Sequence, residues 1–165
     1  MSVSLIVTTY NWPDALELCL KSALAQTRLP DEIIVADDGS TSETAERIAA
    51  VARTTSLPLV HSWQEDQGFR AAMSRNRAIA RSSGDYLIMI DGDMILDSRF
   101  IQDHINAVQK GYFVQGGRVL IDPDRTAQLV KEKSIALFWG SRGLSNRKNA
   151  LHSPWLSRLF STVCT

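Results

Sequence analysis

The segment Ser-Val-Ser-Leu-Ile-Val-Thr-Thr at residues 2–9 decides the fold class of this chain. It is a continuous run of apolar and β-branched residues, the pattern of a strand that is buried on both faces. Pro13 follows a short polar break and fits the first turn of a helix. Leucine and alanine then recur at helical spacing to about Gln26, so the chain begins as a strand followed by a helix.

The same alternation continues along the chain. Further strands are predicted over residues 32–37, 57–63, 86–90 and 113–121. One helix is predicted to begin at a capping box of Ser40 and Glu43, with Ala45, Ile48, Ala49 and Ala52 inward. Another runs from Ser98 to Gly111, with Ile101, Ile105 and Val108 inward. Two more are predicted from Gly68 to about Ser82 and over residues 126–137. This order predicts a single α/β domain with a mainly parallel sheet flanked by helices.

Composition places the chain among ordinary globular proteins. It has 165 residues, of which 44% are hydrophobic and 22% charged, which excludes collagen, a coiled coil and wholesale disorder. The 18 basic and 18 acidic residues cancel, so we expect no nucleic-acid partner. The charge is uneven, however, because six Lys/Arg against one acid from Thr126 onward leave +5 there and −5 over residues 1–125.

Nothing in the sequence indicates a membrane span or a secretory signal. The apolar runs are shorter than the ~18 residues that cross a bilayer, and no basic segment precedes the first of them. Cys19 and Cys164 are the only cysteines and lie far apart, so we expect reduced thiols. A cytoplasmic protein is the resulting expectation.

Polar clusters follow three of the predicted strands. Residues 8–11 (Thr-Thr-Tyr-Asn) follow the first, residues 37–40 (Asp-Asp-Gly-Ser) the second, and residues 91–93 (Asp-Gly-Asp) the fourth. In open parallel sheets the carboxyl ends of the strands meet at one edge, and ligands bind beyond it. The clusters therefore predict one binding site at that edge.

Asp91 and Asp93 flank a glycine on an extended backbone, which brings two carboxylates near one another. Close carboxylates repel unless a cation lies beside them. Oxygen ligands without a nearby Cys or His pair favour Mg²⁺ or Mn²⁺ over zinc. Taken alone the pattern is weak, and a solvated acidic turn is the alternative.

The other clusters suit a nucleotide. A carboxylate of Asp37 or Asp38 can accept hydrogen bonds from a ribose hydroxyl or a base N–H, and Tyr10 can offer an aromatic face. The arginine-rich helix after Gly68 fits diphosphate recognition. A turn with a helix cap, a packed rim aromatic and a solvated basic face are the structural alternatives.

Together these segments resemble glycosyltransferase family 2 enzymes of the GT-A fold, a Rossmann-like α/β architecture. The resemblance rests on four segments in the same order and covers about residues 2–121. They are VSLIVTTYNWPDAL, EIIVADDGST, EDQGFRAAMSRNRAIARSSGDY and LIMIDGDMIL. The sequence of the third segment is similar to that of bacterial enzymes that build lipopolysaccharide or capsule, including galactosyltransferase-like members.

The resemblance implies a role for each site residue. Thr8 and Tyr10 would line the base pocket, and Asp38, together with Asp37, would hydrogen-bond the uracil or ribose. Arg75 would lie on the diphosphate or sugar side of the donor. Asp91 would contact the ribose or sugar, and Asp93 would coordinate the metal. It further implies a UDP-sugar donor, a glycan or lipid-linked acceptor, Mn²⁺ or Mg²⁺, and inversion by direct displacement.

One departure concerns the catalytic base. Relatives carry an acidic base motif well downstream of Asp-Gly-Asp, whereas the only acid here after Asp124 is Glu132, in a Lys-Glu-Lys stretch. Many relatives also carry a metal-ligating histidine downstream, for which His152 is the only candidate, and a surface residue is the alternative. We therefore divide the chain into a nucleotide-sugar-binding domain, residues 1–121, and an incomplete start of an acceptor-side region, residues 122–165. A truncated donor-binding module with little or no transfer activity is the alternative function.

The basic tail from Ser134 onward carries Trp139, Trp155, Leu156 and Phe160. It could contact the inner face of the inner membrane, where a lipid-linked acceptor would lie. Packing on a missing domain is the other interpretation. A dinucleotide-dependent dehydrogenase is disfavoured because no glycine fingerprint follows the first strand, and a sugar-phosphate nucleotidyltransferase because no Gly-rich, Arg-containing loop lies near the start.

Overall fold

A computed structural model describes residues 1–138 and 140–150 of the chain. The chain divides into two compact units, Met1–Tyr112 and Phe113–Thr165. The first unit holds all three polar clusters and the arginine-rich helix that the sequence predicts to bind a diphosphate.

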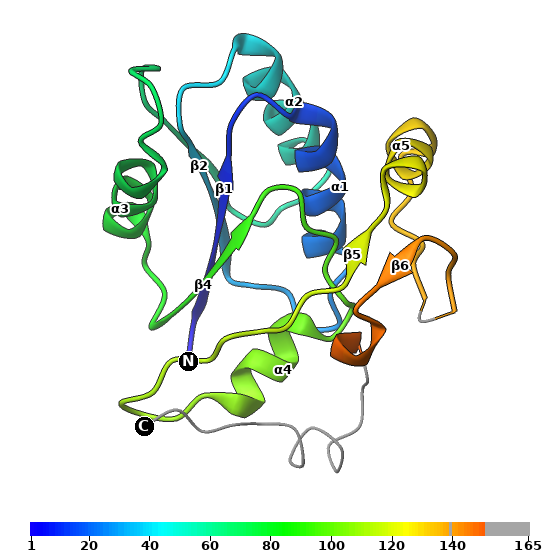
Figure 1. Ribbon diagram of the computed structural model, residues 1–165. Coiled ribbons are helices and arrows are strands. Elements are labelled where there is room, and N and C mark those ends of the chain that lie inside the picture. The colour runs from blue at the N-terminus through cyan, green and yellow to red at the C-terminus, as the bar shows by residue number, and fades with distance from the viewer. Residues whose placement is uncertain (139, 151–165) are drawn as a thin grey trace. The chain divides into compact units, whose positions relative to one another are not determined.

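Four parallel strands form the sheet of the first unit, in the order β3-β2-β1-β4 (Figure 1). They are β1 (Val3–Thr9), β2 (Glu32–Asp37), β3 (Leu59–Trp63) and β4 (Tyr86–Asp91). All seven residues of the central strand β1 are buried, which explains its unbroken apolar run. The predicted α/β architecture with a parallel sheet is confirmed.

Helices cover both faces of this sheet (Figure 1). They are α1 (Pro13–Leu24), α2 (Ser42–Ala52), α3 (Ala71–Arg81) and α4 (Phe100–Ala107). Alternate strand residues separate two cores: one joins the sheet to α1, α2 and α4 through Leu5, Val35, Leu16, Ile48 and Ile101, and the other joins it to α3 through Ile6, Ile34, Ala36 and Ala78. A three-layer arrangement results.

The expected capping box of Ser40 and Glu43 does not form. Helix α2 begins at Ser42 after Thr41, and no side chain caps it. The Ser40 hydroxyl instead accepts a hydrogen bond from the Asn11 amide at 2.9 Å. A contact between distant loops has therefore replaced the local cap.

Two helices bury a slightly different face from the one that the spacing predicts. Helix α2 buries Thr44, Ile48 and Val51, whereas Ala49 is exposed. Val108 lies beyond the end of α4 and is 37% exposed, so its expected inward position is wrong. In α2, burial of the larger Val51 removes more apolar area from water than burial of Ala49 would.

The second unit, by itself, differs most from prediction. The strand expected over residues 113–121 is reduced to β5 (Leu120–Ile121), which pairs antiparallel with β6 (Leu144–Ser145). A short 3₁₀ helix, Arg147–Ala150, follows. The composition of residues 113–119 suits a strand, but these residues pair with no strand in the part of the chain that the structure describes.

Helix α5 (Pro123–Glu132) starts and ends earlier than the predicted span of 126–137. Asp122 caps its start, where Oδ1 accepts from the Arg125 amide at 2.7 Å. Lys133 ends it in a left-handed conformation, with φ 50°.

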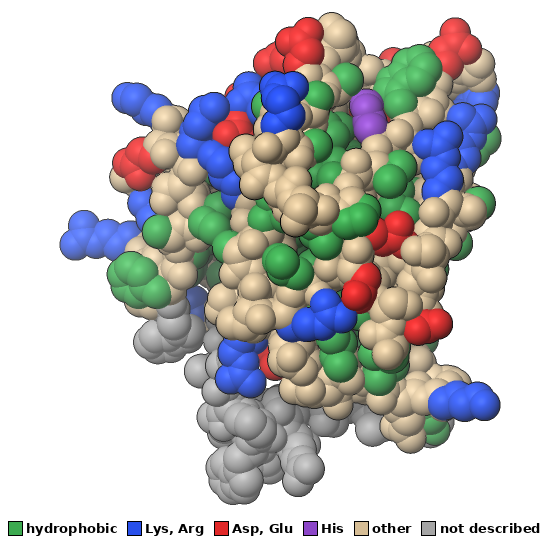
Figure 2. Space-filling view, turned by 180° about the vertical axis from the view of Figure 1, so that it is seen from behind, with side chains coloured by type: hydrophobic (Ala, Val, Ile, Leu, Met, Phe, Trp, Pro, Cys, Tyr) green, Lys and Arg blue, Asp and Glu red, His purple; other side chains and the backbone are tan. Residues whose placement is uncertain are grey.

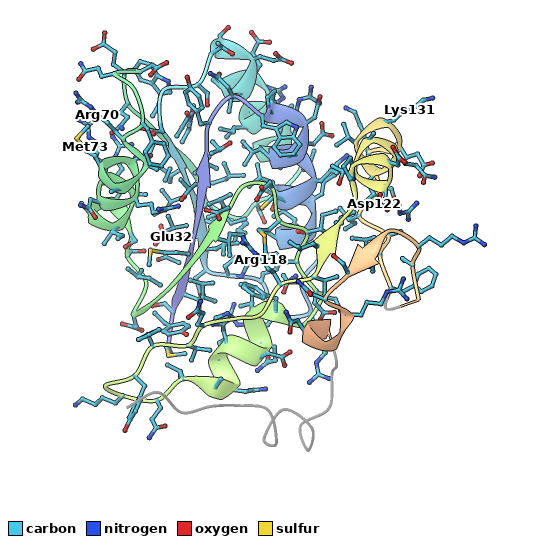
Figure 3. The ribbon with its side chains drawn as sticks, in the orientation of Figure 1. Glu32, Arg70, Met73, Arg118, Asp122 and Lys131 are labelled. Atoms are coloured by element: carbon cyan, nitrogen blue, oxygen red, sulfur yellow. The ribbon has the colours of Figure 1, made fainter. Side chains whose placement is uncertain are left out.

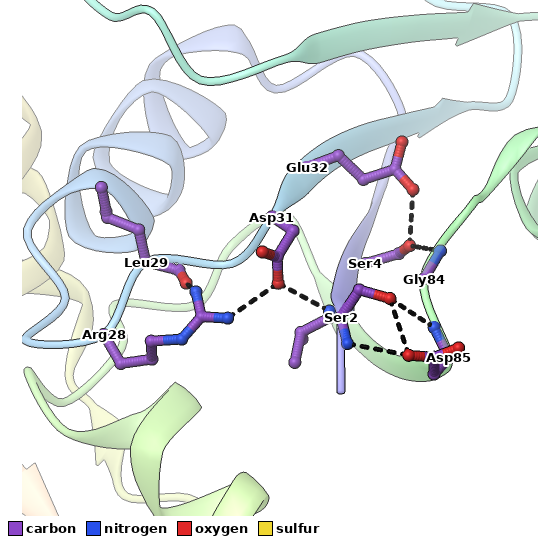
Figure 4. A network of polar contacts seen from close by, with 9 residues as sticks. Ser2, Ser4, Arg28, Leu29, Asp31, Glu32, Gly84 and Asp85 are labelled. Atoms are coloured by element: carbon purple, nitrogen blue, oxygen red, sulfur yellow. Dashed lines mark hydrogen bonds and ion pairs between the residues drawn. The ribbon is translucent and has the colours of Figure 1, made fainter.

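Carboxylates at the amino ends of the strands hold the start of the chain (Figure 4). Glu32 Oε1 accepts from the Ser4 hydroxyl at 2.6 Å, and Asp85 Oδ2 accepts from the Ser2 amide at 3.0 Å. Asp31 accepts from the backbone of β1. Backbone hydrogen bonds lower the pKa of Asp31 and Asp85, and for Glu32 hydrogen bonds outweigh burial, so its pKa is lowered too.

The surface of the described residues mixes charged and hydrophobic groups. On the face seen in Figure 2, basic and acidic side chains are interspersed with hydrophobic ones. None of the helices in the described ranges has the length and apolar character needed to cross a membrane. The tail residues Trp139, Trp155, Leu156 and Phe160 lie outside the described residues.

Candidate functional site

Strand register brings the three polar clusters to one edge of the sheet. In the parallel ladders Thr8 of β1 pairs with Asp91 of β4, and Thr9 pairs with Asp37 of β2. The Asp38 amide then donates to the Thr9 carbonyl at 3.1 Å. The predicted meeting of these clusters at the carboxyl ends of the strands is confirmed.

Arg75 of α3 reaches across this edge. Its Nε donates to the Thr8 hydroxyl at 2.9 Å, and its guanidinium lies 3.1 Å from Asp91 Oδ1. The Arg75 and Asp91 side chains are 40% and 56% exposed, so water screens the pair and it adds little to stability. Thr8, Arg75 and Asp91, from three separate predictions, thus form one contact group.

The turn that carries Asp91 and Asp93 is packed against β1 through Gly92. The Gly92 amide donates to the Thr8 carbonyl at 2.7 Å. A Cβ at this position would lie 2.9 Å from that same oxygen. Only glycine leaves the turn this close to the sheet, and both flanking carboxylates are thereby directed to solvent, where they are exposed.

The two carboxylates of this turn differ in their partners. Asp91 is paired with Arg75, whereas Asp93 makes no hydrogen bond or ion pair with any described residue. No described residue therefore occupies the oxygens of Asp93, which can accept a ligand.

Cys19 of α1 lies beneath this turn and is fully buried. Burial, opposed by a backbone hydrogen bond from Met94, raises the pKa of the thiol to about 12, and the carboxylates of Asp93 and Asp91 add to the rise. The thiol is a packing group at neutral pH, not a nucleophile.

Asp37 lies below the site rather than in it. Its side chain is completely buried, with Oδ1 accepting from the Ser40 amide at 2.8 Å and Oδ2 lying 2.8 Å from His61 Nε2. Burial opposes the charge, but the hydrogen bonds from His61 and Ser40 outweigh it and lower the pKa of Asp37. Internal donors thus contact both oxygens of Asp37, and the donor contact expected of this residue stays a prediction.

Asp38 is clamped at the edge itself. Oδ1 accepts from the Gln64 side-chain amide at 2.6 Å, and Oδ2 accepts from the Arg70 backbone amide at 2.8 Å. Arg70 precedes the first turn of α3, close to Met73 (Figure 3). The N-terminus of α3, which the sequence assigns to a diphosphate, thus has a carboxylate of the chain itself beside it.

Tyr10 stands at the rim, 53% exposed. Its hydroxyl donates to Asp66 Oδ2 at 3.0 Å, and this hydrogen bond raises the pKa of Tyr10. Gly39 closes the same corner with φ 100°, in a conformation and a space that exclude a side chain, since a Cβ would lie 2.5 Å from the Asp66 backbone. The hydrogen bond to Asp66 thereby holds the half-exposed tyrosine at the rim.

A divalent cation fits this edge only in part. The described residues contain no group of three or more His, Cys, Asp or Glu side chains that could enclose a metal. Asp93, without an internal partner, can supply one carboxylate ligand. That donor set suits Mg²⁺ or Mn²⁺, which are commonly held by one or two carboxylates together with phosphate oxygens of a substrate.

Two residues that support the site, Gln64 and His61, were not predicted from the sequence; they contact Asp38 and Asp37. Asn11 belongs to the predicted cluster of residues 8–11, and its side chain accepts a hydrogen bond from the Thr41 amide. The signal available for Gln64 was its position directly after a strand, the same position that singles out Asp38 and Asp91. Contacts made by His61 and Asn11 depend on which strands are neighbours.

The fold and this edge define an α/β protein with polar side chains gathered at the carboxyl ends of its parallel strands. A family model, Glycosyl transferase family 2, matches residues 4–158. The chain belongs to glycosyltransferase family 2, and its first unit has the GT-A fold of that family.

Curated relatives match part of the chain. It is 32% identical over 109 residues to the glycosyltransferase GlyG of Streptococcus pneumoniae, covering 66% of this chain and 35% of GlyG. It is 30% identical over 106 residues to the hyaluronan synthase of Pasteurella multocida, covering 64% of this chain and 11% of the synthase. The chain therefore spans only a minor share of the length of these relatives.

Solved structures match in the same way. Residues 1–349 of TarS from Staphylococcus aureus in complex with UDP give a TM-score of 0.55 at 25% identity, covering 64% of this chain and 31% of that one. The mannosyltransferase PcManGT of Pyrobaculum calidifontis gives 0.58 at 22% identity, covering 77% and 37%. The second match bears on the fold alone.

Proposed function

We propose that this chain is the donor-binding part of an inverting glycosyltransferase that moves a sugar from a UDP-sugar to a surface-polysaccharide or lipopolysaccharide acceptor. The observation that carries the proposal is the single edge formed by the clamped Asp38, the Thr8–Arg75–Asp91 contact group and the unpartnered Asp93. Carboxylates can accept from a base N–H or a ribose hydroxyl, a guanidinium suits phosphate oxygens, and the exposed ring of Tyr10 can contact a base.

The roles follow from these positions. Tyr10 and Thr8 would contact the base, Asp38 would accept from the uracil or ribose, and Asp91 would contact the ribose or sugar with Arg75 holding it in place. Asp93 would hold Mn²⁺ or Mg²⁺ on the diphosphate, and when bound that ion would neutralise charge on the departing nucleoside diphosphate.

The relatives support the choice of donor and metal. TarS has been solved with UDP and with UDP-GlcNAc, and a glucosyl-3-phosphoglycerate synthase from Mycobacterium tuberculosis with Mn²⁺ and UDP. A hyaluronan synthase and a poly-β-1,6-N-acetyl-D-glucosamine synthase from S. aureus are among the curated relatives, which favours a polysaccharide product. The reaction would take place in the cytoplasm, with the basic tail at the inner face of the membrane.

Donor binding without efficient transfer is the second candidate function. Among the described residues, Glu132 is the only acid after Asp124, and on α5 it accepts a hydrogen bond from Gln128 at 2.8 Å. No described carboxylate is therefore assigned as the base. Sugar transfer to an added acceptor by the purified chain would contradict this second candidate.

Calorimetric titration with UDP, with and without Mn²⁺, tests the proposal. We expect metal-dependent binding that Asp93→Ala abolishes, and Glu46→Ala is the matched control because it removes one exposed carboxylate from α2. Absence of UDP binding both with and without Mn²⁺ would contradict the proposed function. Metal-independent binding, or binding that Asp93→Ala leaves unchanged, would contradict the assignment of Asp93.

A further inference from the structure

We propose that Gln64 is a positioning residue that makes Asp38 a selective acceptor for a nucleobase with an N–H group on its pairing edge. The inference rests on the proposed function, because it assigns a nucleobase to Asp38. It goes beyond that function by naming the residue that sets the selectivity of the site.

Gln64 is built into the sheet edge. It directly follows β3, and its amide donates to the Asp37 carbonyl at 3.2 Å, which extends the pairing of β3 with β2 by one residue. Its side chain is only 2% exposed. The backbone and the side chain of Gln64 are therefore both held in place without a ligand.

The side-chain amide of Gln64 and the backbone of Arg70 act on Asp38 together. Gln64 Nε2 donates to Oδ1 at 2.6 Å, and the Arg70 amide donates to Oδ2 at 2.8 Å. Nε2 also lies 3.4 Å from the Arg70 carbonyl, so Gln64 joins the two halves of the clamp. Two N–H donors thus hold this carboxylate, which is 4% exposed, and direct its remaining lone pairs.

The other end of the Gln64 amide shows that this orientation has a cost. Oε1 is buried and finds no hydrogen-bond partner among the described residues. Turning the amide by half a rotation would place Oε1 against Asp38 Oδ1, with two acceptors facing each other. The unsatisfied acceptor is thus retained so that Nε2 can serve Asp38.

The chemical consequence is a preference among bases. An acceptor-only carboxylate accepts from uracil N3–H but has nothing to receive from a base that is methylated at N3. If Gln64 fixes the carboxylate, its loss should weaken binding of UDP and leave binding of N3-methyl-UDP nearly unchanged. A merely structural role would weaken both nucleotides alike.

The test compares UDP and N3-methyl-UDP by calorimetry on the full chain. We expect Gln64→Leu to lower the preference for UDP by about tenfold, the factor that corresponds to about one charge-assisted hydrogen bond. Gln26→Leu is the matched control, because Gln26 is also buried and its amide makes three hydrogen bonds, to Ser22, Asp97 and Ile101. The control should destabilise the fold and leave the preference intact.

Gln64→Glu supplies a second measurement with a pH profile. A charged carboxylate cannot donate to Asp38, whereas a protonated one can, so the preference for UDP should be absent at neutral pH and return as the pH falls. A preference unchanged in both Gln64 variants would overturn the inference. If Asp38→Asn also leaves the preference unchanged, the failure lies in the base contact of the proposed function; if Asp38→Asn removes it, the failure lies in the role of Gln64 alone.

Discussion

The guanidinium of Arg75 lies 3.1 Å from Asp91 Oδ1 and ties that carboxylate to Thr8 on the neighbouring strand. The ion pair distinguishes the two acids of the Asp-Gly-Asp turn. Asp91 is paired with Arg75, whereas Asp93 has no ion-pair partner among the described residues. Identical side chains two residues apart are thereby prepared for different partners.

Replacing Arg75 by lysine should separate charge from geometry. Lysine keeps the positive charge but lacks the fork that contacts Thr8 and Asp91 at once. We expect UDP to bind about tenfold more weakly, with the free energy of unfolding changed by less than about 0.5 kcal/mol because the pair is exposed. Titration calorimetry and urea unfolding measure the two quantities, and equal affinity in the variant would argue against a positioning role.

Gly92→Ala should damage the site through the backbone. The added Cβ would lie 2.9 Å from the Thr8 carbonyl oxygen and 3.3 Å from Leu16 Cδ1, so the turn must move. A cost of about 1–3 kcal/mol is expected from overpacking, together with weaker metal-dependent UDP binding. Gly116→Ala, where no atom lies within 4 Å of the new Cβ, is the control and should be neutral in thermal unfolding.

Asp37 should behave as a structural residue. Asp37→Ala leaves the Gly39 and Ser40 amides and His61 without their buried acceptor, and we expect it to cost about 2–4 kcal/mol of stability. Asp37→Asn keeps an acceptor for the two amides, so it should cost less and leave UDP affinity near that of the natural chain. A folded Asp37→Asn variant that fails to bind UDP would restore the direct donor contact to consideration.

The carboxylates at the amino ends of the strands should make the fold sensitive to acid. Glu32, Asp31, Asp85 and the buried Asp37 all have pKa values lowered in the folded state. Their contribution is complete above the unfolded-state pKa, about 4, and is lost as the pH falls through the lower folded-state values.

Urea unfolding at a series of pH values checks this dependence. The free energy of unfolding should be flat above about pH 5 and fall below about pH 4. Glu32→Gln removes one titrating group while keeping an acceptor for Ser4, so its curve should be shallower between these values. An identical slope in the variant would show that Glu32 does not contribute.

Cys19 should be unreactive in the folded chain. Its burial and a pKa of about 12 leave almost no thiolate at neutral pH. In a Cys164→Ser background, a thiol reagent such as dithionitrobenzoate should react only after the chain is unfolded in urea. Rapid reaction under native conditions would mean that α1 opens far more often than its packing indicates.

The sequence predicts the first unit well because its elements carry strong and local signals. The span of β2 is predicted to the residue, since a β-branched run is bounded by a Leu-Pro-Asp turn on one side and paired acids on the other. The sheet edge follows from topology, so the meeting of Thr8, Asp38 and Asp91 is predictable without side-chain detail.

The remaining features depend on partners that a single sequence does not reveal. Residues 113–121 have the composition of a strand, but only Leu120 and Ile121 find one to pair with. Asp37 and Asp38 are equivalent in sequence, and only the fold shows that His61 contacts the first and Gln64 the second. Such distinctions arise from packing across strands.

The parallel order of the sheet also determines when the site can exist. Thr8 belongs to the first strand made and Asp91 to the last of the four, so their pairing closes the longest loop in the sheet. A nascent chain that has emerged only as far as α2 already carries Thr8 and Asp38 but has neither Arg75 nor Asp91 to set beside them. Affinity for the nucleotide should therefore appear abruptly during synthesis, once the fourth strand has joined the first.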